Sequence, residues 1–421
     1  MKVWIVNVGE PMAVDPGVER KLRMGLVADR LAEQGHEVVW WTSTFDHNYK
    51  RQRYHKDTTV RVAAGIELRF LYAPSYSANI SIARLRNHYL LGRAFARAAA
   101  STPEHELPDV IFATMPIVEL AAAAARFGKA HDIPVIIDIR DLHPDIYLNL
   151  VPKALHPLAR RAMDRLYREL RTSLKLASGI IAIAPSFLRW GLQHAGRTQS
   201  ETDSVFPLAY PEIEASAAEV EAAAKELKSL GVRDDRRIIW YVGTFNRWID
   251  LNTPIEAARA LAQSGREEYQ FVLSGSGDFD EQWRRLARGL PNVVFTGWIG
   301  VPHIIHLRTI SWAGLAPYRP GFLTVGNKLF EYMAGGLPIF LSIAGDAKAI
   351  IEANGCGIAY SGGNADSLLS AIDQLAEPDV RSRMASNSRN AFEEHYSANH
   401  VYGEMVRYIE HLVTRSVGVA S

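Results

Sequence analysis

Lys328 and Glu331 are the two charged side chains in the stretch of this sequence that is best suited to bind a ligand. They lie in a predicted short helix over 327–334, which follows a glycine-containing loop and ends at Gly335. Residues three apart share one side of a helix. The helix dipole disfavours a lysine in the first turn, so a phosphate held by the lysine and the free N–H groups would explain it better. The alternative is a solvated Lys–Glu pair, and these residues alone favour neither interpretation.

Glycine-containing turns follow four successive predicted strands in the second half of the chain, and the last turn leads into this helix. The carboxyl ends of parallel strands meet at one edge of a sheet, where ligands bind. Glycine lets a backbone approach a ligand closely, and arginine or lysine can bind phosphate. The recurrence therefore predicts a nucleotide site. The turns contain Gly243, Thr244 and Arg247, then Gly275 and Gly277, then Gly297 and Trp298, and finally Arg319 and Gly321.

The elements that position these residues alternate between strand and helix along both halves of the chain. This alternation predicts two doubly wound α/β domains with parallel sheets. Strands are expected at 3–8, 38–42, 66–72, 109–113, 134–138 and 179–183, and then at 237–242, 270–274, 292–295, 312–316 and 338–341. Helices are expected at 18–34, 80–100, 117–131, 156–177, 185–194, 252–264, 279–288, 301–309, 327–334, 345–352, 364–376, 379–395 and 398–414.

The alternation stops between about 207 and 236, where prolines and an Ala/Glu-rich run intervene. We therefore predict a first domain over 1–209, a linker over 210–235 and a second domain over 236–397. Two domains also suit a length of 421 residues, which is too long for one ordinary core.

Composition excludes several classes of protein. A formal net charge of +1 gives no overall case for nucleic acid binding. The single cysteine, Cys356, excludes an internal disulfide and suits a reducing compartment. We expect no signal peptide, because Met1-Lys2 leads directly into a predicted strand, and no apolar run is long enough to cross a membrane. The G-x-G-x-x-G fingerprint is missing after the first strand, which disfavours a nicotinamide enzyme.

Two basic segments could contact anions. The run 50–56 contains two lysines and two arginines, and is either a surface loop or a contact for an anionic acceptor or membrane. The predicted helix 156–177 is basic and amphipathic, with five arginines and one lysine against two acids. Its basic face is either solvated or bound to anionic lipid. Asp278-Phe-Asp280 spells D-x-D, but it precedes a predicted helix, so we interpret it as a helix cap.

The second half of the chain resembles the donor domain of retaining GT-B-fold glycosyltransferases of family four. The string 326–338, Gly-Asn-Lys-Leu-Phe-Glu-Tyr-Met-Ala-Gly-Gly-Leu-Pro, resembles the family's P-x-K-x-x-E-Y-M-A-x-G-x-P variant of the E-x7-E motif. The first half resembles the family's other domain at Gly35-His-Glu-Val38 and at Asp138-Ile-Arg-Asp-Leu-His-Pro144. The resemblance covers nearly the whole chain. It also implies that the final helix, within 398–421, packs back on the first domain.

The resemblance assigns roles to individual residues. Glu331 would bind the ribose hydroxyls of a donor nucleotide, while Lys328 and Arg247 would face its diphosphate. Gly17, in the loop after the first strand, would approach the diphosphate from the first domain. One departure stands out, because Leu323 occupies the position of the motif's first glutamate. Another group must therefore make that sugar contact.

The resemblance also implies transfer with retention, in which the donor phosphate acts as the base. Fixed cations would then stabilise the leaving diphosphate, and we expect neither a metal nor a cofactor. Asp141 is our first candidate for a catalytic or sugar-orienting group, with Arg140 and His143 as its neighbours at a strand end. A structural role for Asp141, in an ion pair with Arg140 or a helix end, is the alternative.

The substrates implied by the resemblance are a UDP- or GDP-sugar and a glycan or polyprenyl-linked acceptor in cell-surface polysaccharide synthesis. The expected location is the cytoplasm, with peripheral contact to the inner face of the membrane. Two other functions remain open. The chain could be a nucleotide-sugar epimerase with the same fold, or a partner subunit without catalytic activity.

Overall fold

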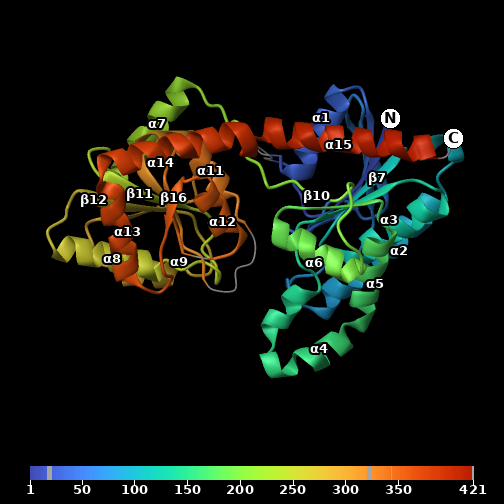
Figure 1. Cartoon of the computed structure of the whole chain (residues 1–421), viewed down its shortest axis with the longest axis horizontal. Helices are drawn as coiled ribbons and strands as arrows, with labels where there is room; N and C mark the ends of the chain where they lie inside the picture. Colours follow the sequence, from blue (N-terminus) through green and yellow to red (C-terminus); the bar gives the residue numbers. More distant parts are fainter. Residues whose placement is uncertain (17–20, 320–324, 343, 420–421) are drawn as a thin grey trace. The chain divides into compact units, whose positions relative to one another are not determined.

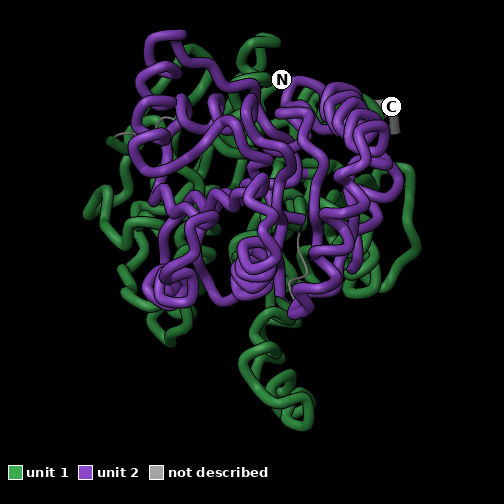
Figure 2. The backbone as a smooth tube through the Cα atoms, turned by 90° about the vertical axis from the view of Figure 1, so that its left-hand side faces the viewer, with its two compact units in different colours: residues 1–207, 401–421 green, residues 208–400 purple. Residues whose placement is uncertain are grey.

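The computed structural model describes residues 1–16, 21–319, 325–342 and 344–419 of the chain, with side chains described up to residue 415. The chain forms two compact units, one of residues 1–207 with 401–421 and one of residues 208–400 (Figure 2). Each unit has its own sheet.

Unit 1 is built on an eight-stranded sheet in the order β10-β9-β8-β7-β1-β2-β6-β5. All its neighbouring strands pair in parallel except β5, which is antiparallel to β6 at the edge. Helices α1 and α15 cover one face, and α2, α3, α5 and α6 cover the other (Figure 1). The strands are β1 (Lys2–Val6), β2 (Glu37–Ser43), β5 (Thr58–Ala63), β6 (Ile66–Leu71), β7 (Val110–Thr114), β8 (Val135–Ile139), β9 (Gly179–Ala182) and β10 (Ser204–Val205), with a separate ribbon of β3 (Phe45–Asp46) and β4 (Arg51–Gln52). The α-helices are α1 (Arg23–Glu33), α2 (Ile82–Ala100), α3 (Val118–Ala130), α4 (His156–Ala162), α5 (Asp164–Leu176), α6 (Pro185–Ala195) and α15 (Ala398–Val419).

Unit 2 is built on a six-stranded parallel sheet in the order β13-β12-β11-β14-β15-β16. Its strands are β11 (Arg237–Val242), β12 (Tyr269–Ser274), β13 (Val293–Gly297), β14 (Ser311–Ala316), β15 (Ile339–Leu341) and β16 (Gly357–Ala359). Its α-helices are α7 (Ala217–Ser229), α8 (Asn252–Gln263), α9 (Asp280–Leu286), α10 (Val301–Ile310), α11 (Lys328–Ala334), α12 (Asp346–Ala353), α13 (Ala365–Ala376) and α14 (Pro378–Ala391). The prediction of two doubly wound α/β units is confirmed.

Several details differ from the sequence predictions. The antiparallel edge strand β5 and the short strands β3, β4, β10 and β16 were not expected. The predicted helix 156–177 is two helices, because the chain leaves helical geometry at Met163. Residues 210–235, predicted as a linker, belong to unit 2: a capping box at Ser216 starts α7, which packs against α10.

A buried ion pair fixes the carboxyl edge of the sheet in unit 1. Arg23, at the start of α1, donates from Nε to Asp138 Oδ2 at 2.9 Å and from Nη2 to Oδ1 at 3.2 Å. The two side chains are 1% and 0% exposed. The third guanidinium nitrogen donates to the Pro207 carbonyl, and the guanidinium lies 5.8 Å from the ring of Tyr402 on α15. One pair therefore connects β8, α1 and the C-terminal helix.

Residues of α15 make further contacts within unit 1. His36 Nε2 lies 2.8 Å from Glu410 Oε1, and the Tyr408 hydroxyl donates to the Thr202 carbonyl at 2.6 Å. A Cβ atom on Gly179 would lie 2.2 Å from that hydroxyl, so β9 requires glycine where α15 crosses it. The last helix is thus an integral layer of unit 1.

We predict that Arg23→Met lowers the free energy of unfolding by about 3–5 kcal/mol, because the substitution leaves the Asp138 carboxylate buried without its partner. Urea titration measures the loss. Lys21→Met is the matched control, since Lys21 pairs with Asp29 at the surface and such pairs contribute at most about 1 kcal/mol. Equal losses in the two variants would contradict a structural role for the buried pair.

Candidate functional site

Helix α11 is held against the sheet of unit 2 by the ring and hydroxyl of Tyr332. The hydroxyl donates to the Leu315 carbonyl at 2.9 Å and accepts from the Val242 N–H at 3.2 Å, so it bridges β14 and β11. A Cβ atom on Gly314 would lie 2.3 Å from the Tyr332 ring, which therefore packs directly on the backbone of β14. This packing places Lys328 and Glu331 at the carboxyl edge of the sheet.

Lys328 is half-buried as a residue, and its amine is enclosed by aromatic rings. Its Nζ lies 4.3 Å from the ring centre of Tyr241 and 4.8 Å from that of Tyr318. Within the described parts of the chain, no carboxylate lies within 4 Å of this amine. Burial lowers the pKa of Lys328 to about 7. An amine in this setting favours an anionic ligand, because the ligand would supply the missing counter-charge.

Glu331 is buried and paired with Arg308 of α10. Arg308 Nε donates to Glu331 Oε1, and its guanidinium lies 4.7 Å from the centre of the Tyr210 ring. Oε2 of Glu331 has no hydrogen-bond donor among the described residues. The interpretation of Lys328 and Glu331 as a solvated pair is wrong, because Glu331 pairs with Arg308 and Lys328 lies between two rings.

The glycines of the strand-end turns are required by contacts between the turns themselves. A Cβ atom on Gly275 would lie 1.9 Å from the Gly243 carbonyl oxygen, and one on Gly277 would lie 2.4 Å from the Phe245 carbonyl oxygen. The backbone N–H groups of Gly243 and Phe245 donate to the Ser274 and Ser276 carbonyls at 3.0 and 2.9 Å. A Cβ atom on Gly243 would lie 3.3 Å from Lys328 Nζ. The turns after β11 and β12 thus form one layer, which meets Lys328 at Gly243.

Four of the residues predicted to bind the donor in unit 2 do not contact Lys328. Arg247 is exposed and lies over the neighbouring Trp248 ring, with its guanidinium carbon 4.8 Å from the ring centre. Trp298 is 72% exposed, and Thr244 is exposed with its carbonyl accepting from the Tyr241 hydroxyl. The Arg319 guanidinium donates to the Ile249 carbonyl at 3.1 Å and so holds a loop. Within the described ranges, none of these side chains contacts Lys328.

Three predictions fall outside the described residues. They are the approach of Gly17 to the diphosphate, the glycine of the fourth turn at Gly321 and the position of Leu323 within the motif. The glycine of the motif at Gly326 is described. A Cβ atom there would lie 2.1 Å from the Tyr318 hydroxyl. Glycine at this position therefore leaves room for one of the two rings that enclose Lys328.

In unit 1, Arg140 forms an ion pair with Glu10, whose carboxylate is 1% exposed. Burial opposes the charge of Arg140, but Glu10 and Asp138 raise its pKa above the usual value. Glu10 Oε2 also accepts from the Met24 and Gly25 N–H groups at the start of α1, at 2.9 and 3.3 Å. The predicted catalytic neighbour of Asp141 is therefore a structural cation.

Asp141 and His143 lie together after β8. His143 Nε2 is 3.5 Å from Asp141 Oδ2, and the Asp141 side chain is 40% exposed. Asp141 does not pair with Arg140, which is held by Glu10 instead. Its Oδ1 accepts from the Leu142 N–H at 2.9 Å. An exposed carboxylate next to an imidazole at a strand end can orient a hydroxyl group of a substrate.

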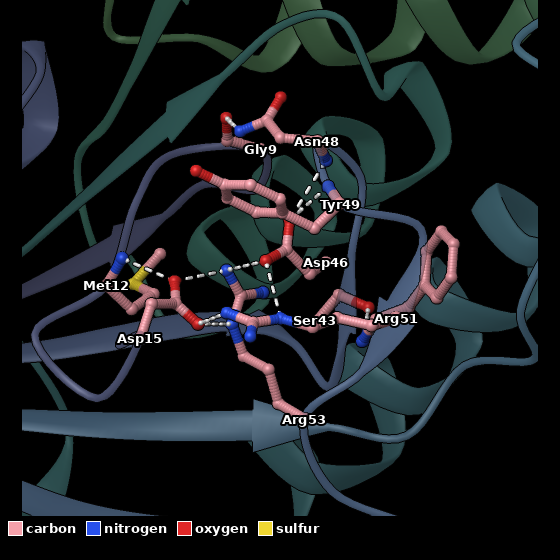
Figure 3. Close-up of polar contacts among 10 residues, drawn as sticks. Gly9, Met12, Asp15, Ser43, Asp46, Asn48, Tyr49, Arg51 and Arg53 are labelled. Carbon is pink, nitrogen blue, oxygen red and sulfur yellow. Dashed lines mark hydrogen bonds and ion pairs between the residues drawn. The ribbon is translucent and has the colours of Figure 1, made fainter. Parts of the chain in front are cut away.

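Two arginines of the basic run 50–56 point toward carboxylates of the same unit (Figure 3). Arg53 donates to both oxygens of Asp15 at 2.6 Å, and Arg51 Nη2 donates to Asp15 Oδ1 at 3.1 Å. Both arginines also lie within 3.4 Å of Asp46 Oδ2. Burial alone would raise the pKa of Asp15, but the Arg53 hydrogen bonds and the Met12 N–H lower it. The two arginines therefore connect the loops after β1 and β2 and are not free to bind an external anion.

The interpretation of Asp278-Phe-Asp280 as a helix cap is wrong. Phe279 is the N-cap of α9, no side chain caps it, and Asp280 accepts from Arg284 at 2.8 Å. Within the described residues, no group of three or more His, Cys, Asp or Glu side chains could hold a metal ion. None of the described helices is long and apolar enough to span a bilayer.

Sequence reasoning missed the residues that support the site. They are Arg308, Glu10 and the tyrosines that surround Lys328 or hold α11. Arg308 lies 23 positions before Glu331 and Glu10 lies 130 before Arg140, so no local spacing connects them. The tyrosine of the Glu331-Tyr332 pair was the available signal, because a buried tyrosine needs a hydrogen-bond partner.

Two family models cover most of the chain. Residues 21–197 match a model described as "Glycosyl transferase 4-like domain", and residues 236–378 match one described as "Glycosyl transferases group 1". The chain is 29% identical over 175 residues to "Alpha-D-kanosaminyltransferase" of Streptomyces kanamyceticus, and 28% identical over 167 residues to "O-antigen chain mannosyltransferase C" of Escherichia coli. These matches cover 41% and 38% of this chain. They span just under half of those relatives, 45% and 43%.

Solved structures share the fold at low identity. Sucrose-phosphate synthase from Thermosynechococcus elongatus has a TM-score of 0.69 at 16% identity, covering 100% of both chains. Anabaena Alr3699/HepE, solved in complex with UDP, has a TM-score of 0.64 at 16% identity, covering 97% of this chain and 99% of that one. WaaG, a glycosyltransferase involved in lipopolysaccharide biosynthesis, has a TM-score of 0.62 at 16% identity, covering 95% and 99%.

We predict that the stability difference between the wild type and Lys328→Met depends on pH. The folded pKa of about 7 lies below the unfolded value of about 10.4, so the unfolded chain binds more protons between these values. Relative to the variant, wild-type stability should be flat below pH 7 and should rise above it by up to about 1.4 kcal/mol per pH unit. Urea titration at several pH values measures this.

Lys348→Met is the matched control for this measurement, because Lys348 lies on the surface of α12 beside Glu352. Its difference from the wild type should not change between pH 7 and 9. A pH-independent difference for Lys328→Met would contradict a buried amine without a counter-charge.

Proposed function

Because the chain joins two glycosyltransferase domains in the GT-B fold, we propose that it transfers a sugar from a nucleoside diphosphate donor to a glycan or polyprenyl-linked acceptor. The observation that carries this proposal is the Lys328 amine, enclosed by Tyr241 and Tyr318 next to the Gly243 turn. A donor diphosphate at this point would provide the anion that the described part of unit 2 does not supply.

In this proposal Glu331 holds the ribose of the donor. Arg308 occupies Oε1 and orients the carboxylate, which leaves Oε2 to accept hydroxyl hydrogens. Arg308 is thus a positioning residue. The relative Alr3699/HepE was solved with UDP and with UDP-glucose, so UDP is the first nucleotide to test and GDP the second.

The chemistry proposed for Lys328 is electrostatic. Departure of the nucleotide develops negative charge on the diphosphate, and a fixed ammonium group stabilises that charge without a metal ion. The donor phosphate would serve as the base, so the transfer would retain the anomeric configuration. Asp141 and His143, at the carboxyl edge of unit 1, are the proposed groups that orient the sugar or acceptor hydroxyls. Cell-surface polysaccharide synthesis is the pathway class we propose, as for the mannosyltransferase and WaaG relatives.

Isothermal titration with UDP, GDP and ADP tests the donor site. Wild-type protein should bind one of the three, and Glu331→Ala should weaken binding about tenfold or more through loss of charged hydrogen bonds to ribose. Lys328→Met should weaken it by at least as much. Glu352→Ala is the matched control, because this exposed glutamate lies on the neighbouring helix α12.

Absence of binding to all three nucleotides would contradict the donor site as a whole. Unchanged affinity in Glu331→Ala would contradict the ribose contact alone and leave the role of Lys328 standing. Transfer of label from a UDP-sugar to a lipid-linked oligosaccharide extract then separates a transferase from an epimerase or a partner subunit.

We also propose that α4 contacts anionic lipid at the cytoplasmic face of a membrane. Helix α4 projects from the rest of unit 1 (Figure 1) and has no buried residue. Leu155 and Leu158 are 48% and 68% exposed, and Arg160 and Arg161 beside them form no ion pair among the described residues. Exposed leucines flanked by arginines suit the interface of an anionic bilayer. This assigns the contact to α4, because on α5 Arg165 pairs with Glu119, and Arg168 and Arg171 pair with Asp164.

Vesicle sedimentation tests the contact. Leu155→Ser with Leu158→Ser, or Arg160→Gln with Arg161→Gln, should reduce pelleting with vesicles that contain phosphatidylglycerol, towards the level found with phosphatidylcholine alone. Arg168→Gln with Arg171→Gln on α5 is the control and should pellet like the wild type. If the α5 variant alone loses pelleting, the assignment to α4 is contradicted.

A further inference from the structure

A cluster of basic side chains lies at the carboxyl edge of the sheet in unit 1, whereas Lys328 belongs to unit 2. Its cations are Lys50, from the loop that joins β3 and β4, and Arg84, from the first turn of α2. Both are half-buried. Three histidines from separate segments surround them, namely His47, His88 and His143. Five groups that can carry positive charge therefore meet at one place.

Contacts within the cluster hold the two cations in position without neutralising them. Lys50 donates to the side-chain oxygen of Asn79, and its Nζ lies 5.0 Å from the centre of the Tyr76 ring. Arg84 donates to the Asn79 carbonyl at 2.7 Å and lies 3.3 Å from His88 Nε2. All of these partners are uncharged acceptors, an aromatic ring or another base.

Two of the histidines, His47 and His88, are kept neutral by the same surroundings. Burial, then Lys50 and Arg84, lower the pKa of His47 to about 4. Burial, then Arg84 and two other histidines, lower the pKa of His88 well below its usual value. His47 Nδ1 lies 2.6 Å from the Tyr76 hydroxyl. Neutral imidazoles beside fixed cations can still donate hydrogen bonds to an anion.

The carboxylates nearest to the cluster have other partners. Asp46 lies beside Arg51 and Arg53, and its charge also acts on Lys50 from beyond ion-pair distance. Asp141 lies beside His143. In the described part of the chain, neither Lys50 nor Arg84 has a carboxylate within 4 Å. Two cations held close together repel each other, and this arrangement favours an anion between them.

We propose that the cluster of Lys50, Arg84 and the three histidines is a second anion site, which binds a phosphate group of the acceptor. The site itself stands independently of the donor site, whereas its assignment to the acceptor rests on the proposed transferase function. Lys50 and Arg84 supply charge, and His47 and His88 supply oriented donors to phosphate oxygens. Asp141 lies beside His143 of the cluster, where an acceptor hydroxyl would be oriented.

Exposed apolar side chains border the cluster. Ile80 and Ile82 are 59% and 85% exposed and lie between Asn79 and Arg84 in the sequence, while Leu85 is 38% exposed. An acceptor with a phosphate attached to a hydrocarbon chain would match both the cations and this apolar margin. A soluble sugar phosphate would use the cations alone, so the test below separates the two sources.

The first measurement titrates inorganic phosphate by calorimetry into a chain that carries Lys328→Met, so that the unit 2 amine does not contribute. Adding Lys50→Gln with Arg84→Gln should weaken phosphate binding about tenfold or more. Lys56→Gln with Arg86→Gln is the matched control, because both residues are exposed and lie in the same loop and helix. Unchanged affinity in the Lys50/Arg84 variant, or an equal loss in the control, overturns the site.

The unfolding temperature distinguishes an anion site from a purely structural role, because the two predict changes of opposite sign without phosphate. Phosphate should raise the unfolding temperature of the Lys328→Met chain but not that of the Lys50/Arg84 variant. Without phosphate, the Lys50/Arg84 variant should unfold at the same temperature or higher, because it loses the repulsion between cations. A lower unfolding temperature without phosphate, together with unchanged phosphate affinity, would show that these residues serve stability only and overturn the proposal.

The second measurement separates the sources of phosphate and uses the otherwise unmodified chain. Vesicles of phosphatidylcholine with polyprenyl phosphate should pellet the wild type more than the Lys50/Arg84 variant, whereas vesicles with phosphatidylglycerol should pellet both equally through α4. If glucose 6-phosphate binds and is lost in the variant while polyprenyl phosphate makes no difference, the site takes a soluble phosphate. UDP titration in parallel distinguishes failure of this site from failure of the donor site. The Lys50/Arg84 variant should bind UDP like the wild type even if it does not bind phosphate.

Discussion

The cost of burying a charge is the constraint on which both units of this protein depend. An unpaired ion loses its hydration when it is buried, and a partner of opposite charge restores only part of that loss. The chain accordingly pairs many of its deeply buried charges. Examples are Arg23 with Asp138, Arg140 with Glu10, Arg53 with Asp15 and Arg308 with Glu331. Within the described residues, Lys328, Lys50 and Arg84 are partly buried without a carboxylate partner, and in our proposals they are the places where an anion binds.

Aromatic packing determines how precisely these charges are placed. Tyr332 holds α11 against two strands through one hydroxyl, and its ring leaves space only for glycine at position 314. Tyr241 and Tyr318 enclose the Lys328 amine and lower its pKa by excluding water. Gly275 and Gly277 lie in turns that resemble ligand-binding turns, but here they allow the turns after β11 and β12 to pack against each other. A glycine-rich edge is thus first a packing device, and it presents a ligand site only where a charged side chain reaches it.

The two units carry different kinds of anion chemistry in the proposed function. Unit 2 offers an amine and an oriented carboxylate, a combination suited to a diphosphate and a ribose. Unit 1 offers several bases with an apolar border, a combination suited to a phosphate beside hydrocarbon. A basic side chain in the sequence is not by itself a sign of anion binding, because Arg51 and Arg53 pair with Asp15 inside unit 1. Of the basic run 50–56, Lys50 enters the anion cluster while its arginines hold loops together.

The sequence by itself determined the alternation of strands and helices, the division into two α/β units and the helix that carries Lys328 and Glu331. These features follow from local periodicity, glycine positions and short spacing, which are properties of neighbouring residues. Tertiary structure decided which charges are paired, because Arg308 and Glu10 reach their partners across 23 and 130 positions. It also decided that Arg140 is structural, that residues 210–235 belong to unit 2 and that the histidines of unit 1 converge. Such outcomes depend on which loops share a sheet edge, and no local pattern encodes that.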